Sequence, residues 1–171
     1  IGWGAVAIMG ALAIATGWFS FPVRGRSDVS FSTAVFVAAL ALFGPAVGVW
    51  VAGPTALILG LLKRGSGVRG SVKAMGIKAA AAAAAGAVYS LLGGHALAAG
   101  MSAADAGRIL VLFGVFAVVT AAFRAVANGD TATDVAREIE NRISLRRGVG
   151  IELATVPLSL LLVMSYTVKD V

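Results

Sequence analysis

Long apolar stretches dominate the chain, and each is about as long as one or two membrane crossings. The first runs from residue 1 to 23 and carries Trp3 and Trp18 near its ends, where aromatic rings prefer the depth of the lipid headgroups. A second uncharged run extends from residue 29 to 62, which is too long for one untilted helix at about 1.5 Å per residue. The pattern predicts membrane helices, because a helix satisfies its own backbone hydrogen bonds in lipid.

The pair Gly44-Pro45 divides the second run. Proline cannot donate a backbone hydrogen bond and disfavours helix in the residue before it, so we predict a turn here between two helices, at 29–44 and 46–62. A further Gly-Pro pair ends at Pro54. We expect it to kink the second helix without ending it, because the apolar run continues to Leu62.

The rest of the chain alternates in the same way between apolar and polar segments. A basic, glycine-rich loop is predicted from Lys63 to Lys73, and a short connection passes through Ala104 and Asp105. A surface helix is predicted at 131–147, because Val135, Ile139 and Ile143 recur at helical spacing among charged residues. Three more membrane helices complete the pattern, at 74–97, 107–127 and 148–167.

These elements predict an all-α fold, a polytopic membrane helix bundle of about six spans with one amphipathic surface helix, in a single domain over 1–171. Composition agrees: 59% of residues are hydrophobic and 13% charged, against about half and a quarter in soluble domains. The mean hydropathy is +0.94. Because the chain begins at Ile1 and not at methionine, we expect it to be incomplete at both ends.

The formal charge of +6 comes from basic residues between the apolar stretches, where cytoplasmic loops collect them. Six crossings would place all of the 14 Lys and Arg residues except Arg108 and Lys169 on one side. The predicted cytoplasmic basic face includes Lys63, Arg64, Arg69 and Lys73. We therefore expect a multi-pass protein of the bacterial cytoplasmic membrane, with the lipid bilayer and other membrane subunits as partners and no nucleic acid.

The string VSFSTAVFVAALALFGPAVGVWVAGPTALILGLLKRG, with AAAAAAAGAVYSLLGG and VPLSLLLVMSY later in the chain, resembles the multi-helix membrane sensory domains that precede GGDEF and HD-GYP domains in bacterial signalling proteins. The resemblance implies a helix before residue 1 and another after 167. No GGDEF, HD or GYP motif is present, so cyclic-di-GMP chemistry is not assigned. Either the soluble part is missing, or the membrane module serves as a separate subunit.

Few residues carry candidate chemistry. There is no cysteine and one histidine, His95. His95 is a candidate for binding a cofactor, whose identity the sequence leaves unknown, but no second ligand stands at helical spacing and we favour a capping or interfacial role. Gly65, Gly67 and Gly70 have dinucleotide-loop spacing but follow an apolar helix, so we expect a flexible loop.

Arg124 and Glu152 lie at similar predicted depths and could form an intramembrane ion pair. Both are also close enough to the headgroups to act as interfacial anchors, which we favour, and Lys78 is interpreted in the same way. Close helix packing is expected at Gly44, Gly48 and Gly86.

No catalytic set is recognisable, and we predict a non-enzymatic module that packs against partner helices. It would be an anchor or accessory subunit, or the sensory part of a signalling protein. The alternative is a small-molecule-binding protein similar to the substrate-capturing component of a vitamin transporter, with candidate polar residues Ser30, Ser32, Thr33, Tyr89, Ser90 and His95. An ion pathway ranks last, because the central thirds of the predicted spans contain no ionisable residue.

Overall fold

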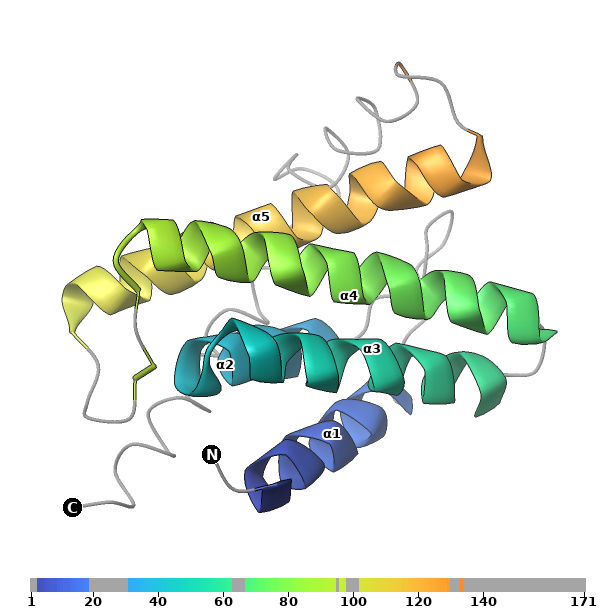
Figure 1. Cartoon of the computed structure of the whole chain (residues 1–171), viewed down its shortest axis with the longest axis horizontal. Helices are drawn as coiled ribbons and strands as arrows, with labels where there is room; N and C mark the ends of the chain where they lie inside the picture. The colour runs from blue at the N-terminus through green and yellow to red at the C-terminus, as the bar shows by residue number, and fades with distance from the viewer. Residues whose placement is uncertain are drawn as a thin grey trace.

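The computed structural model describes residues 3–18, 31–62, 67–94, 96–97, 102–129 and 133. Within these ranges it is all-helical, without a strand. The helices are α1 (Trp3–Trp18), α2 (Ser32–Phe43), α3 (Pro45–Leu62), α4 (Gly67–Leu91) and α5 (Ala103–Asn128). Helix α4 packs between α3 and α5, and α1 lies against α2 and α3 (Figure 1).

The break between α2 and α3 reverses the direction of the chain, as the sequence predicts. Gly44 has φ 89° and ψ 175°, and its N–H donates to the Leu40 carbonyl. A Cβ placed on Gly48 would lie 2.3 Å from the Leu40 side chain. In one continuous helix these two residues would be about 12 Å apart, so α2 and α3 form a helical hairpin. Pro54 lies inside α3, which continues past it to Leu62.

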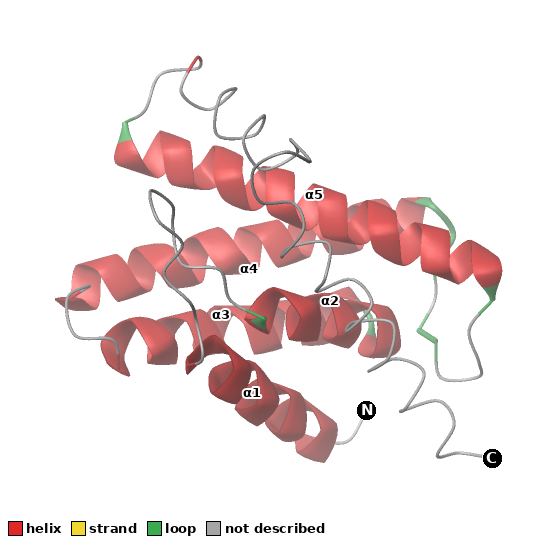
Figure 2. Cartoon of the chain, turned by 180° about the vertical axis from the view of Figure 1, so that it is seen from behind, coloured by secondary structure: helices red, strands yellow, loops and turns green. Residues whose placement is uncertain are grey.

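Helix α2 forms the centre of the bundle. Every residue from Ala34 to Leu42 is buried, because α2 contacts each of the other four described helices (Figure 2). A helix that is apolar on all sides is expected to be enclosed in this way. The ring of Phe36 lies 6.1 Å from that of Phe116 in α5, measured between centroids.

Three of the five described helices, α3, α4 and α5, are long and apolar enough to cross a membrane. Helix α1 has 16 residues and α2 has 12, so they are about 24 Å and 18 Å long, whereas the hydrocarbon core is about 30 Å thick. Within the described residues, helices of full crossing length are thus limited to α3, α4 and α5. The span at 148–167 and, apart from the helical residue Thr133, the surface helix at 131–147 lie outside the described residues.

Helix α4 begins within the segment predicted as a basic loop. Residues 67–73 are helical, because a tertiary contact overrides their glycine-rich composition. Ser71 is fully buried against Gly60 of α3, where an added Cβ would meet its hydroxyl oxygen at 2.7 Å. The Ser71 hydroxyl also donates to the Gly67 carbonyl at 2.8 Å. Helix α4 ends at Leu91 and not at 97.

Helix α5 also begins earlier than predicted, since Ala104 and Asp105 belong to its first turn. Ser102 and Asp105 form a capping box: the Asp105 N–H donates to the Ser102 hydroxyl at 3.2 Å, and the Ser102 N–H donates to the Asp105 carboxylate at 2.9 Å. This reciprocal pair satisfies free N–H groups at the start of the helix. The helix ends before Gly129, which has φ 75°.

Candidate functional site

The glycines predicted to pack closely have different roles. An added Cβ on Gly86 would lie 2.5 Å from the Cβ of Pro45, so α3 starts directly against α4. Gly48 makes the close contact with Leu40 described above. Gly44 has open space around its Cβ position and a positive φ, so it serves the turn and not helix packing.

The four residues of the predicted basic face do not share one environment. Lys63 and Arg64 lie outside the described residues, and Arg69 is exposed. The Lys73 ammonium instead donates to the Ala127 carbonyl and to the Asn128 side-chain oxygen, the latter at 3.1 Å. A cation in this position complements the free carbonyls and the negative end of the α5 dipole. Lys73 thus joins the start of α4 to the end of α5.

Lys78, which the sequence predicts to be an interfacial anchor, contacts an aromatic ring of α5. It is half-buried, and its ammonium nitrogen is 4.9 Å from the centroid of the fully buried Phe116 ring. Phe116 is near the middle of α5, about 18 Å along the helix axis from Asn128. The ammonium therefore lies beside the middle of α5, where the face of an aromatic ring stabilises a cation.

Two polar residues continue the same face of α5 beyond Phe116. Thr120 and Arg124 follow at successive intervals of four residues, which places all three side chains along one line of the helix. Thr120 is 2% exposed, and its hydroxyl has no hydrogen-bond partner among the described residues. Arg124 is half-buried. We call Lys78, Phe116, Thr120 and Arg124 the α4–α5 seam.

The predicted partner of Arg124, Glu152, lies outside the described residues, so their ion pair stays a prediction. The seam itself is a candidate site for another reason. Buried polar groups normally have partners, and leaving a hydroxyl without one costs about 1–3 kcal/mol. Charged residues inside membrane bundles commonly mark binding sites or ion pathways.

A second ionic cluster lies at the opposite end of α5. The Arg108 guanidinium donates to the Asp105 carboxylate at 2.7 Å, and that carboxylate also accepts from the Ser102 hydroxyl at 2.7 Å. Asp105 is 5% exposed, so its charge is neutralised by an ion pair and hydrogen bonds. The cluster fixes the start of α5 with its polar groups already paired.

The loop after α4 folds back onto the bundle near this cluster. The Leu97 N–H donates to the Ala41 carbonyl of α2 at 3.1 Å. Gly94 lies over the buried Tyr89 ring, where an added Cβ would be 2.6 Å away. His95 lies outside the described residues, and the described part of the chain contains no group of three residues suited to hold a metal ion.

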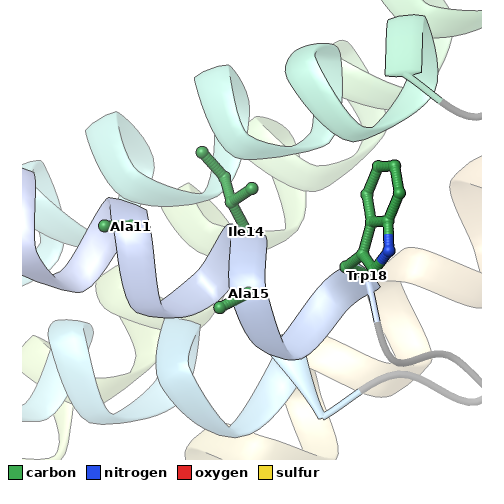
Figure 3. Close-up of a pocket in the computed structure, with 4 residues that line it drawn as sticks. All are labelled: Ala11, Ile14, Ala15 and Trp18. Carbon is green, nitrogen blue, oxygen red and sulfur yellow. The ribbon is translucent and has the colours of Figure 1, made fainter.

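The exposed side of α1 carries a shallow hollow of about 500 Å³ (Figure 3). Its four lining residues, Ala11, Ile14, Ala15 and Trp18, all belong to this one helix. They offer hydrocarbon contact and no polar group except the indole N–H. This surface is suited to lipid chains.

Two features of these sites were missed from the sequence. The capping box has a readable signal, Ser102 with an acidic residue three positions later. The contact of Lys78 with Phe116 could not be predicted from the sequence, because it depends on how α4 and α5 pack together.

Comparison of the chain with known protein families, curated proteins and solved structures finds no match.

Proposed function

We propose that this chain is a non-enzymatic integral membrane module that acts by packing against partner membrane helices. It would serve as an anchor or accessory subunit of a larger complex, or as the membrane part of a bacterial signalling protein. The observation that carries the proposal is the presence of small residues on the outward faces of α4 and α5.

On α5, Gly107 and Gly114 are both exposed, and a Cβ placed on either would have no atom within 4 Å. They are seven residues apart and therefore share one face. On α4, Gly76, Ala83 and Ala87 are likewise exposed. Small residues let another helix approach closely in lipid, where apolar surface alone gives little driving force.

Leucine substitution on the outward face of α5 tests this proposal. We expect Gly114→Leu to reduce recovery of membrane subunits cross-linked to the full chain at least about tenfold, which corresponds to about 1.4 kcal/mol. The melting temperature of the isolated chain should stay close to that of the unsubstituted protein. Gly10→Leu is the matched control, because Gly10 in α1 also has open space around it.

Equal recovery of cross-linked subunits with the Gly114→Leu and unsubstituted chains would contradict the proposal. A fall in recovery accompanied by a fall in melting temperature would show a folding defect and would also count against it.

We further propose six crossings of the bacterial cytoplasmic membrane. The positive-inside bias supports this arrangement, because it places Arg108 apart from the basic segment at the start of α4. The signalling role rests on the resemblance alone, and the complete reading frame beyond both ends tests it.

The transporter-like alternative has less support. Its described polar candidates do not converge, because Ser32 begins α2 whereas Tyr89 lies near the end of α4 that contacts the opposite end of α2. These ends are about 18 Å apart. A ligand pocket needs polar groups that converge.

A further inference from the structure

We propose that the first two turns of α4 form a binding surface for the phosphate headgroups of anionic phospholipids. The surface consists of Val68, Arg69, Val72 and Lys73, which we call the headgroup patch, and all four residues are exposed. The proposal depends on the membrane location of the chain, but not on the packing of α5 against partner helices.

The headgroup patch lies where three long apolar helices have their ends together. The start of α4 contacts the end of α3 through Ser71 and Gly60. It contacts the end of α5 through Lys73, whose ammonium donates to Ala127 and Asn128. Figure 1 shows these three ends on the same side of the bundle. Because α3, α4 and α5 are each long enough to cross the hydrocarbon core, their shared ends would lie at the depth of the lipid headgroups.

Apolar and cationic side chains form two neighbouring rows on this surface. Val68 and Val72 are 69% and 54% exposed, and their spacing of four residues places them along one line of the helix. Arg69 and Lys73 have the same spacing and form the adjacent row. Apolar residues beside basic ones suit the membrane interface. The exposed valines favour a lipid over a soluble phosphate, because only the lipid brings apolar surface to cover them.

The two cations of the patch can hold one phosphate group. Side chains four residues apart on a helix have Cβ atoms about 5–6 Å apart, and the Arg69 guanidinium can donate two parallel hydrogen bonds to phosphate oxygens. The Lys73 ammonium has three N–H donors. Among the described residues, Ala127 and Asn128 accept two of them, which leaves one for a phosphate oxygen.

The charge around the patch matches an anionic lipid. The sequence contains no Asp or Glu between Asp28 and Asp105. Asp105, the sole acidic residue in the described part of the chain, is paired with Arg108 and lies about 33 Å along α5 from Ala127. Each Lys or Arg near an anionic bilayer surface adds to the attraction. The patch should therefore prefer phospholipids with a net negative charge to zwitterionic ones.

The test measures the melting temperature of the full chain in neutral detergent micelles that contain phosphatidylglycerol, or phosphatidylcholine as the zwitterionic control. The patch variants are Arg69→Gln, Lys73→Gln and the double substitution. Arg69→Lys keeps the charge and is the conservative control. Lys169→Gln controls for net charge, because it removes one cation that the sequence predicts on the opposite side of the membrane; Lys169 lies outside the described residues.

We expect phosphatidylglycerol to raise the melting temperature of the unsubstituted chain by about 4 °C or more relative to phosphatidylcholine. The Arg69→Lys and Lys169→Gln chains should keep most of this shift. Arg69→Gln and Lys73→Gln should each lose about half of it, and the double variant nearly all. Salt at about 1 M should also reduce the shift, because it screens exposed charges.

An equal shift in the unsubstituted and doubly substituted chains would overturn the proposal, as would the absence of any shift. A loss with Lys169→Gln as large as that with Arg69→Gln would show a general charge effect and would also count against the patch. Sodium phosphate added to the phosphatidylcholine micelles is the soluble probe, and a shift equal to that with phosphatidylglycerol would replace the lipid by a free anion. If Lys73→Gln does not fold, Arg69→Gln keeps the test decisive, because Arg69 is exposed.

Discussion

Single glycines in this bundle differ sharply in what surrounds them. Gly86 faces Pro45, and the nearest backbone atom, the Pro45 Cα, would lie 3.1 Å from an added Cβ. Gly76 on the same helix faces open space. Alanine substitutions at the two positions should therefore change the free energy of unfolding in opposite directions.

We expect Gly86→Ala to lower the free energy of unfolding by about 1–3 kcal/mol, because the new methyl group forces α3 and α4 apart. Gly76→Ala should raise it by about 0.5–1 kcal/mol, because alanine loses less backbone entropy in a helix. Denaturant titration of the purified chain in mixed micelles measures both. Equal effects of the two substitutions would contradict the packing described here.

The capping box gives a second prediction at the scale of one residue. Ser102→Ala should destabilise the chain by about 1 kcal/mol, because it removes the acceptor for the Asp105 N–H. Ser90→Ala is the control, since the Ser90 hydroxyl only bonds back to Gly86 in its own helix, and should cost less than about 0.5 kcal/mol. The same titration compares them, and a loss no larger for Ser102→Ala than for Ser90→Ala would be inconsistent with a capping role.

At the scale of elements, the turn at Gly44 determines how α2 and α3 pair. Gly44 combines φ 89° with ψ 175°, a region open almost only to glycine. Gly44→Ala should therefore cost about 1–3 kcal/mol in unfolding free energy, although an added Cβ would touch nothing. Gly10→Ala, a helical glycine in open space, is the control and should cause no loss. A stable Gly44→Ala protein would argue against the observed turn.

The sequence predicts the existence of these elements better than their limits. Proline and hydrophobic length are local signals, so the hairpin at Pro45 and the apolar helices can be read directly. The start of α4 depends on the contact of Ser71 with Gly60, and such a tertiary contact has no local signal. The start of α2 at Ser32 is equally hidden, because the limits of a helix within an apolar run have no strong local signal.

The same limit applies to the candidate site. The sequence predicts an interfacial position for Lys78 but not its contact with Phe116, and it carries no signal that Thr120 is buried. The surroundings of both residues depend on how the chain packs in three dimensions, which the local sequence does not encode. Arg124 was recognised from sequence, because a charge inside an apolar stretch stands out locally.

At the scale of the whole molecule, the proposed topology places the segments around residues 26 and 66 on one side of the membrane and residue 96 on the other. The chain contains no cysteine, so single-cysteine variants can report this without background. With an impermeant maleimide added to the outside of intact cells, Ala96→Cys should be labelled and Arg26→Cys and Ser66→Cys should not. Labelling of residue 26 without residue 66 would rule out six crossings.

The enclosure of α2 also bears on how the molecule would respond to its bilayer. Residues 34–42 of α2 are buried and offer lipid little surface, so a change in membrane thickness would act first on α3, α4 and α5. Long helices adjust to a thinner membrane by tilting. Helices α3, α4 and α5 would tilt around α2, and their ends would move most. Lys73 lies near one of these ends and the Asp105–Arg108 pair near another.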